Sequence, residues 1–484
     1  MELEKWFASM SAEQRELMLE RASEDPLRKT FDGKRTVHAG LKGRLTAPGE
    51  AQKIWTGLMR QAPVRGLRQA AYIHIPFCQT KCLYCGFFQN QSEQAAEDQY
   101  VSHLVRELEA ASECPRIADG LIHAVFMGGG TPTSLSPANM KKLLKAIRTN
   151  LPLSNDCEWT LEGRIHDVVP EKLEVWMNGG INRVSLGVQS FHTRIRQQLG
   201  RIDSGETVRQ RIAELKSWGQ CAVIVDLIYG LPDQTMRIWQ EDLDMLEEAD
   251  VDGMDLYQLN VYEGCDLDRR IREGRMPPAA STEEQADMYA AAVDFVSRRA
   301  FHPLSIRHWS RGSRERNMYN TMAKEGVTLF PFGSGAGGHV DGYSMMLHRF
   351  LKPYEAMVDQ HQKPFMGLLK QSSLQPVVNI IMHQMEQGYF NLIAVKKMDQ
   401  RMGDLKWLFD LWQDRGLVRY NGVSYCLTEA GEFWQVNVAQ TVLECVQKLA
   451  GQELPPVVQR IAAQNHPSAR RRTDRGSPLL HSGH

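Results

Sequence analysis

Hydrophobic residues recur in two alternating patterns along the middle of the chain. Short apolar runs, such as Tyr72–Ile75 and Ile122–Met127, are typical of buried β-strands. Between such runs, apolar residues recur at i, i+3, i+4 and i+7, which predicts helices with one buried face. The helical positions are Val101, Leu104, Val105 and Leu108, and then Met140, Leu143, Leu144 and Ile147. Four further strand-like runs are Trp159–Glu162, Arg183–Gln189, Val223–Ile228 and Met254–Leu259. Such alternation predicts parallel strands covered by helices.

Six strand–helix repeats are too few for a complete eight-stranded barrel, so the sequence predicts an open, partial (β/α)6 barrel. In that architecture, functional residues lie at the carboxyl ends of the strands. Residues 262–325 are expected to form a helical connection. Val327–Phe332 is expected to be a further strand that leads into a glycine-rich segment, residues 333–338.

The chain divides into four expected parts. Residues 67–345 form the partial barrel, and residues 1–66 form an N-terminal arm over it, with one short helix within 1–28. Residues 346–462 are expected to form a helical, winged-helix-like domain with a helix at Leu405–Leu411 and a hairpin near Tyr425. Its helices carry no basic stripe, so we expect a cover over the barrel mouth and no nucleic-acid partner. Residues 463–484 are rich in arginine and predict a disordered basic tail.

Composition narrows the class of protein. Of the 484 residues, 42% are hydrophobic and 24% charged, as in a soluble globular protein. The formal net charge of −1 gives no general electrostatic attraction to nucleic acid or anionic membranes. No apolar run is long enough to span a bilayer, and the N-terminus does not resemble a signal peptide. Nine cysteines, three of them clustered, argue against a disulfide framework and predict the reducing cytoplasm.

The clustered cysteines are Cys78, Cys82 and Cys85, directly after the first predicted strand. Their C-x₃-C-x₂-C spacing lets one tight loop wrap three thiolates around an iron–sulfur cluster. A missing fourth ligand leaves one metal position open for another molecule. Two alternatives are a zinc site completed by a distant histidine and three unrelated buried thiols.

The residues around the cysteines resemble the signature of radical S-adenosylmethionine (radical SAM) enzymes. Tyr72, His74, Pro76 and Phe77 precede the first cysteine, and Tyr84 precedes the third, as in the branch that contains oxygen-independent coproporphyrinogen oxidase. The resemblance spans about residues 70–345. It implies a [4Fe–4S] cluster on the three cysteines, whose open iron binds SAM and whose reduction cleaves SAM to a deoxyadenosyl radical.

A glycine run, Gly128-Gly129-Gly130-Thr131, follows the second predicted strand. Glycines let the backbone approach a ligand closely, and the run matches the family motif that binds the amino group of SAM. By the same resemblance, the contacts of a first SAM are Tyr72, Gly129, Glu162 and Gly337. Those of a second SAM are Tyr84, Gly130, Thr131, Gln189, Arg201 and Asp226. Without the resemblance, the glycines indicate only a turn. Arg201 and Asp226 would then indicate only a buried or surface ion pair.

Two departures narrow the family: one from the coproporphyrinogen oxidases, and one from a haem-trafficking relative, which usually has a shorter chain and a different run after its third cysteine. Phe87 stands where coproporphyrinogen oxidases carry a further cysteine, and the run Gly86–Asn90 resembles the anaerobic haem-degrading anaerobilin synthases. This resemblance implies a radical SAM methyltransferase that opens the haem ring without oxygen, releases iron and gives a methylated linear tetrapyrrole. The implied partners are haem as substrate, a flavodoxin or ferredoxin as electron donor, and a small haem-accepting protein. Coproporphyrinogen III oxidation and haem transport without turnover are the alternatives. The haem-binding residues are not assigned by the sequence.

Overall fold

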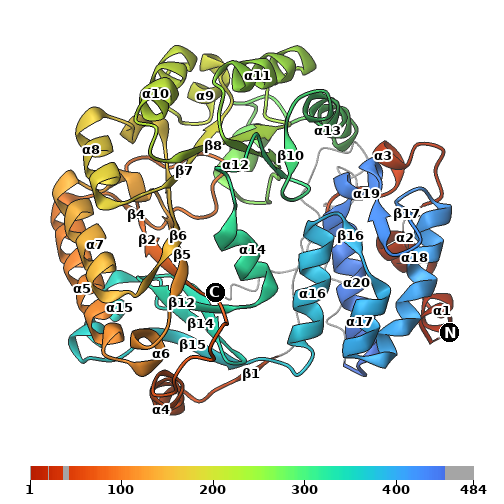
Figure 1. The fold of residues 1–484 in the computed structure, drawn as a ribbon. Helices are drawn as coiled ribbons and strands as arrows, with labels where there is room; N and C mark the ends of the chain where they lie inside the picture. The colour runs from red at the N-terminus through yellow and green to blue at the C-terminus, as the bar shows by residue number, and fades with distance from the viewer. Residues whose placement is uncertain (1, 20, 36–42, 453–484) are drawn as a thin grey trace.

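The computed structural model describes residues 2–19, 21–35 and 43–452. All six predicted strands are present and lie side by side in chain order, each parallel to the next. They are β2 (Gln69–Ile75), β5 (Ile122–Gly129), β6 (Leu153–Gly163), β7 (Arg183–Gln189), β8 (Ala222–Tyr229) and β9 (Gly253–Gln258). Most of their side chains are buried on both faces, as in other parallel sheets. The predicted α/β fold is confirmed (Figure 1).

Helices between the strands cover the outside of this curved sheet (Figure 1). They are α5 (Gln94–Ser112), α7 (Pro137–Asn150), α8 (Pro170–Gly179), α10 (Gly205–Ser217), α11 (Met236–Glu248) and α13 (Thr282–Ser297). Side-chain caps define where several of them begin: the Ser136 hydroxyl accepts from Asn139 N, and Ser281 forms a capping box with Glu284. Shorter helices in the same connections are α6 (Pro115–Ala118), α9 (Thr193–Gln198) and α12 (Asp266–Arg272).

The sheet continues beyond the six strands at both edges. Next to β2 lies β12 (Thr328–Phe332), parallel to it as a seventh strand. Beyond β12 run the antiparallel strands β13 (Gly337–Val340), β14 (Tyr343–Leu347), β15 (Phe365–Lys370) and β1 (Arg44–Leu45). At the other edge, β11 (His308–Ser310) pairs antiparallel with β9, and β10 (His302–Pro303) pairs with β11. The expectation of an entirely helical connection over 262–325 was therefore wrong, because strands of two and three residues leave no readable periodicity.

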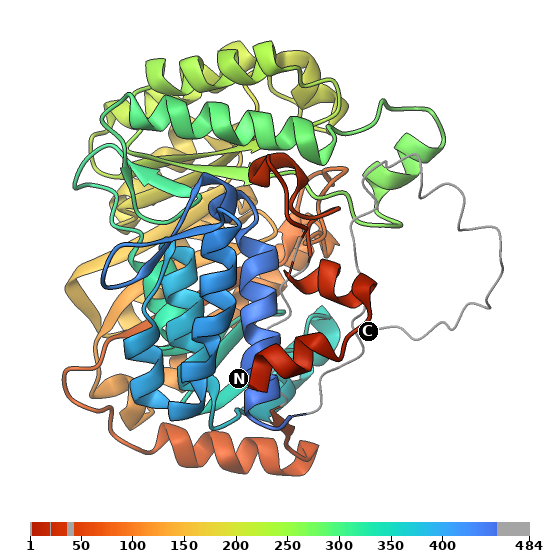
Figure 2. The same cartoon turned by 90° about the vertical axis from the view of Figure 1, so that its right-hand side faces the viewer.

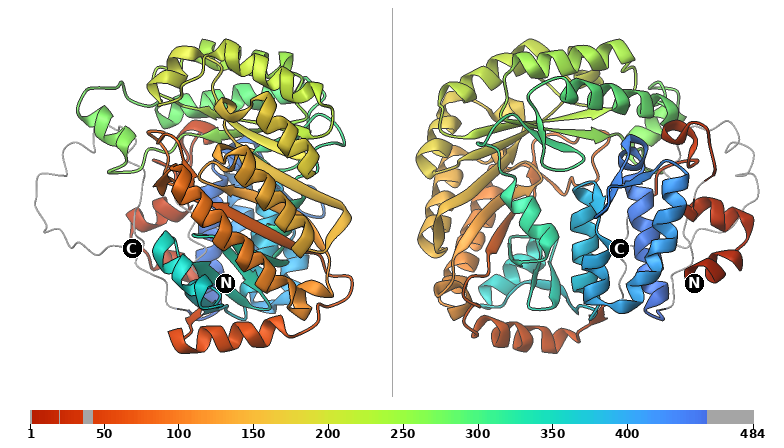
Figure 3. Two further views of the ribbon diagram at one scale, coloured as in Figure 1. Left: turned by 90° about the vertical axis from the view of Figure 1, so that its left-hand side faces the viewer. Right: turned by 45° about the vertical axis from the view of Figure 1, so that its right-hand side comes forward.

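One helix closes the interior of the barrel. Helix α14 (Met318–Glu325) lies between the barrel strands and the C-terminal helices (Figures 1 and 3). The Glu158 carboxylate of β6 accepts hydrogen bonds from the backbone N–H groups of Met318 (3.0 Å) and Tyr319 (3.2 Å). Met322 is fully buried against Ala70 of β2, among the small cluster that also contains Ala124 and Leu329. These contacts attach α14 to the inner face of the strands.

The C-terminal region is a separate helical layer. It comprises α16 (Gln375–Glu386), α17 (Leu392–Met398), α18 (Leu405–Asp414), α19 (Glu429–Phe433) and α20 (Gln435–Leu449). A small antiparallel sheet of β16 (Tyr389–Phe390), β18 (Tyr425–Leu427) and β17 (Val418–Tyr420) accompanies them. The expected domain boundary after residue 345 falls inside β14, and β14, α15 (Leu351–Asp359) and β15 precede the first helix of this layer.

The N-terminal segment packs mainly on the C-terminal layer (Figure 2). It forms α1 (Glu2–Ala8), α2 (Ala12–Leu19) and α3 (Pro26–Lys29) where one short helix was expected, and a fourth helix, α4 (Pro48–Met59), that was not expected. Phe7 stacks on Trp407 with ring centroids 5.5 Å apart, and Thr441 Oγ1 donates to the carbonyl of Met18 (2.8 Å). The expected basic tail lies outside the described residues. Within those residues, no helix has both the length and the apolar content needed to cross a bilayer.

Candidate active site

The three cysteines lie in a loop that is closed at its base. Cys78 belongs to β3 (Phe77–Cys78), which pairs in parallel with β4 (Asn90–Gln91), so residues 79–89 project from this pair. Inside the loop, Cys85 N donates to Cys82 O (3.2 Å). Leu83 N donates to Leu199 O (3.2 Å), and Leu83 O accepts from Leu267 N (3.0 Å). The loop is therefore held by the segments that follow β7 and β9.

Hydrogen-bond donors and a cation lie beside the thiols, although burial of Cys78 outweighs them and leaves its pKa above the usual value. Burial raises the pKa of the Cys78 thiol, while a hydrogen bond from the Thr131 hydroxyl (3.3 Å) and the charge of Arg164 lower that pKa. The backbone N–H of Phe87 donates to Cys85 Sγ (3.3 Å). Because iron binds the thiolate and not the thiol, such donors and cations suit an anionic iron–sulfur cluster.

All nine cysteines are unpaired, including Cys78 and Cys82, which are buried, and Cys85, which is half-buried. In the part of the chain that the structure describes, no three His, Cys, Asp or Glu side chains are arranged to hold one metal ion. A [4Fe–4S] cluster takes its cysteines on different irons, so its ligands do not converge on a single ion.

The glycine turn after β5 is bonded directly to the segment that leads into the cysteine loop. Gly130 N donates to Ile75 O, and Thr131 N donates to Phe77 O, both at 2.8 Å. A Cβ atom at Gly130 would lie 2.5 Å from Phe77 O, and Gly129 has φ of +111°, where a side chain is strained. The structure thus gives a physical reason for the glycines and brings the turn beside Cys78.

His74 lies against this turn, and the sequence did not assign it a role. Its Nδ1 is 3.0 Å from the hydroxyl of Tyr72, and a Cβ atom at Gly129 would lie 2.5 Å from its ring. Burial lowers the pKa of His74 to about 4, with a smaller opposing effect of the neighbouring Gln89, so the imidazole is neutral at neutral pH. The Tyr-x-His-x-Pro pattern, in which His74 stands, was the sequence feature that could have indicated a role for it. Gly335, two residues before Gly337, also approaches this histidine, because a Cβ there would be 3.4 Å from His74 Nε2.

Two of the predicted carboxylates lie along the inner face of the barrel. Burial raises the pKa of Glu162, at the end of β6, to about 7, against a hydrogen bond from Gly129 N–H that lowers it. Burial, with the charges of Asp255 and Glu162, raises the pKa of Asp226 to about 8. Ser185 Oγ donates to Asp226 Oδ1 (3.2 Å). Carboxyl groups with pKa values near neutrality are typical of functional sites.

The remaining predicted residues converge at the end of β7. Gln189 has φ of +72° beside a bulge in the pairing with β8, and its Oε1 is buried without a hydrogen-bond partner among the described residues. Arg201 donates to Gly187 O (3.0 Å) and to the Tyr84 hydroxyl (2.7 Å), while its Nε is also buried without a partner in the described chain. Buried polar atoms normally have partners, and these two atoms are free to bond a polar ligand. Arg201 pairs with Tyr84, and the alternative of an Arg201–Asp226 ion pair is not what the structure shows.

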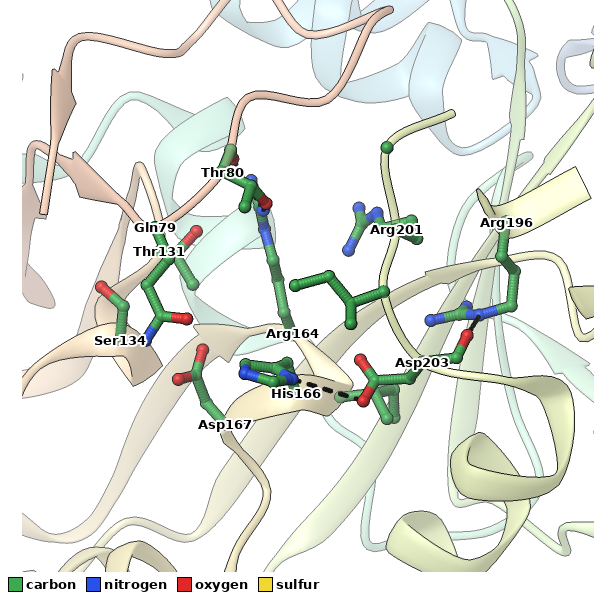
Figure 4. Close-up of a pocket in the computed structure, with 13 residues that line it drawn as sticks. Gln79, Thr80, Thr131, Ser134, Arg164, His166, Asp167, Arg196, Arg201 and Asp203 are labelled. Carbon is green, nitrogen blue, oxygen red and sulfur yellow. Dashed lines mark hydrogen bonds and ion pairs between the residues drawn. The ribbon is translucent and has the colours of Figure 1, made fainter. Parts of the chain in front are cut away.

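A small cavity of about 20 Å³ lies beside the cysteine loop, between the turn after β5 and the loop after β7 (Figure 4). Thr131, Arg164 and Arg201 line it. Arg164 donates from Nη1 to the carbonyl (2.9 Å) and the hydroxyl (3.0 Å) of Thr80, and His166 Nδ1 is 3.4 Å from Asp203 Oδ1. The cavity has room for about one water molecule. Through its bonds to Thr80, Arg164 holds the cysteine loop in place. Its position after β6 gave no sequence signal.

Comparison with known proteins agrees with this geometry. The model of the radical SAM superfamily matches residues 72–246. The anaerobilin synthase of Escherichia coli O157:H7 is 34% identical over 404 residues, which cover 83% of this chain and 90% of that protein. The chain belongs to the radical SAM superfamily. A second relative of this radical SAM enzyme, the haem chaperone HemW of Bacillus subtilis (strain 168), is 30% identical over 277 residues, or 57% of the chain and 72% of HemW.

Among solved structures, the radical SAM enzyme coproporphyrinogen III oxidase (HemN) from Escherichia coli superposes with a TM-score of 0.70, at 20% identity, over 83% of this chain and 96% of that one. The likeness shows a shared fold. Membership of the superfamily implies a [4Fe–4S] cluster and SAM. The residues present fit both: three thiols with hydrogen-bond donors and cations beside them, a glycine turn against the loop, and buried polar atoms without partners.

Proposed function

We propose that this radical SAM enzyme is an anaerobic haem-degrading methyltransferase. It transfers a methyl-derived carbon from SAM to the haem macrocycle, opens the ring at a meso bridge, and releases iron with a methylated linear tetrapyrrole. The observation that supports this most is the similarity to anaerobilin synthase, which extends over 83% of the chain, far beyond the residues of the superfamily model.

Each part of the site has a role in this proposal. Cys78, Cys82 and Cys85 hold the cluster, which supplies the electron that cleaves SAM when it is bound and reduced. Tyr72, Gly129, Glu162 and Gly337 bind the first SAM. The carboxylate of Glu162 accepts hydrogen bonds from polar hydrogens of this SAM. The neutral His74 orients the Tyr72 hydroxyl.

A second SAM is held by Tyr84, Gly130, Thr131, Gln189, Arg201 and Asp226. The support for it is the convergence of Arg201, Tyr84 and Gln189 around Gly187, with the unpartnered Gln189 Oε1 and Arg201 Nε atoms. This molecule is the methyl source in the proposal. A flavodoxin or ferredoxin supplies electrons, a small haem-accepting protein takes part in haem handling, and the reaction takes place in the cytoplasm.

The deciding experiment offers haem and coproporphyrinogen III separately to the anaerobic, reduced enzyme with methyl-labelled SAM. Mass spectrometry should show a labelled linear tetrapyrrole from haem together with free iron. Formation of protoporphyrinogen with haem untouched would identify a coproporphyrinogen oxidase instead. Haem binding without SAM cleavage would identify a chaperone, the activity that the similarity to HemW supports.

A matched pair of variants tests the cluster ligands. Cys82→Ser should lose the cluster and all SAM cleavage. Cys221→Ser, at a cysteine that is equally buried (3% exposed against 1%) but distant in the sequence, should retain both. Iron and sulfide analysis with Mössbauer spectroscopy measures the difference, and stoichiometric zinc in the unmodified protein would contradict the assignment.

A further inference from the structure

Four charged side chains form a buried row across the edge of the barrel. Arg183 of β7 donates from Nε to both oxygens of Glu315 (2.9 and 3.2 Å). His308 of β11 lies between two carboxylates, with Nε2 3.1 Å from Glu315 Oε1 and Nδ1 2.9 Å from Asp255 Oδ2. The side chains of Arg183, Glu315 and His308 are at most 3% exposed. Neither the cluster nor the SAM sites described above use this row.

Among these four side chains the charges cancel only when His308 is an imidazolium, because Arg183 and His308 then carry two positive charges against the two negative charges of Glu315 and Asp255. The buried carboxylate of Glu158 on β6 also acts on Arg183, so the surroundings of the row add negative charge. Burial disfavours the charged imidazole, but Asp255 and Glu315 outweigh burial and raise the pKa of His308 to about 9. A neutral His308 would leave a net negative charge away from water, which is costly.

The row ends next to a residue of the proposed second SAM site. Asp226 and Asp255 are register partners on the parallel strands β8 and β9. Asp226 accepts from the Ser185 hydroxyl, and the charges that act on it are those of Asp255, Glu162 and Arg183. On the same side, Tyr257 interacts with Asp226, Asp255, Glu162 and Arg307.

We propose that His308 is a positioning residue that acts through Asp255: as an imidazolium it limits the negative charge beside Asp226, and so sets the pH at which the Asp226 carboxyl loses its proton to bind SAM. This inference rests on the proposed second SAM site. SAM carries sulfonium and ammonium cations and hydroxyl donors, all of which interact better with a carboxylate than with a carboxylic acid. The step is a proton transfer alone: the proton leaves the Asp226 carboxyl for the buffer as SAM binds, and no other bond changes.

The sign of the effect follows from the charge of the row. His308→Gln removes one positive charge and leaves a net negative charge beside Asp226, so the carboxyl should hold its proton to higher pH. Glu315→Gln removes one negative charge and leaves a net positive charge, so the carboxyl should ionise at lower pH. If the row had a purely structural role, the two variants would not shift the ionisation of Asp226 in opposite directions.

The first measurement needs no SAM. Infrared titration of the cluster-loaded enzyme under anaerobic conditions follows the C=O band of a protonated carboxyl, assigned to Asp226 by its loss in Asp226→Asn. The midpoint should lie near pH 8 in the unmodified enzyme, higher in His308→Gln and lower in Glu315→Gln. The control is His103→Gln on α5, where another histidine faces a carboxylate (Asp359, 3.3 Å) outside the barrel, and its midpoint should not move.

An unshifted or lowered midpoint in His308→Gln, or shifts of both variants in one direction, would overturn the inference. Should His308→Gln fail to fold, Glu315→Gln alone decides, and a midpoint that stays in place or rises there would overturn it.

The second measurement is calorimetric titration with SAM at pH 7 in two buffers of different ionisation enthalpy. Two SAM should bind, the second with release of close to one proton per chain, and less SAM should bind at this pH in His308→Gln. The number of SAM molecules bound per chain separates the proposed second SAM site from the proposed effect of His308 on Asp226. Binding of a single SAM with the infrared shifts intact refutes the proposed second site and leaves the effect of His308 on Asp226 standing. Binding of two SAM without proton release overturns the inference and leaves the proposed function standing.

Discussion

Replacing Gly130 by alanine is the most direct perturbation of the way the glycine turn is joined to the cysteine loop. The added Cβ would lie 2.5 Å from Phe77 O and 2.9 Å from Ile75 O, closer than the 3.0 Å below which real Cβ atoms essentially never come. Both neighbours are backbone atoms of the segment that leads into Cys78, so no flexible side chain can move aside.

The magnitude follows from these contacts. Overpacking of this kind costs about 1–3 kcal/mol. Relief of the clash by about 0.5 Å stretches the two 2.8 Å hydrogen bonds from Gly130 N and Thr131 N, each worth about 1 kcal/mol. The expected loss of stability is therefore about 2–4 kcal/mol, together with displacement of Cys78 from its place beside Thr131.

The assay combines anaerobic thermal unfolding with iron and sulfide content per chain. Gly130→Ala should melt earlier and retain less cluster than the unmodified enzyme. The matched control is Gly57→Ala on α4, where nothing lies within 4 Å of the added carbon. There alanine should be neutral or stabilise by up to about 1 kcal/mol, because glycine is a poor helix former. An unchanged melting temperature and full cluster content in Gly130→Ala would refute the steric argument.

Three further predictions follow. Glu158→Ala should destabilise the enzyme by about 2–4 kcal/mol, since two backbone N–H groups at the start of α14 lose their acceptor; equal denaturant midpoints would contradict this. The His308–Glu315 pair should add most stability between about pH 4.5 and 6.5. The contribution of Glu315 is lost as pH falls toward its folded pKa of about 2, and that of His308 is lost as pH rises through its folded pKa of about 9. The difference in melting temperature between the unmodified enzyme and His308→Gln should therefore shrink at both extremes of pH. In Tyr84→Phe, loss of the hydroxyl that accepts from Arg201 (2.7 Å) should weaken SAM binding with little change in cluster content, as equilibrium dialysis and iron analysis measure separately.

The sequence by itself determined the features that depend on local order. Strand and helix periodicity located the six parallel strands, and the spacing of Cys78, Cys82 and Cys85 placed three thiols in one loop, because both patterns are written within a few consecutive residues. The resemblance carried by the flanking motif also led to the superfamily to which the chain belongs.

Only the tertiary structure decided which distant residues meet. His308 and Asp255 are paired across antiparallel strands, and Arg183 and Glu315 are 132 positions apart, so no spacing in the chain links them. The short strands β10 and β11 are too brief to show a period, and α14 begins where Glu158 of a distant strand accepts from its first N–H groups, a contact that propensity does not encode. Charge states of buried groups such as Asp226 likewise depend on desolvation and on neighbours from other strands, and these are set only when the sheet has assembled.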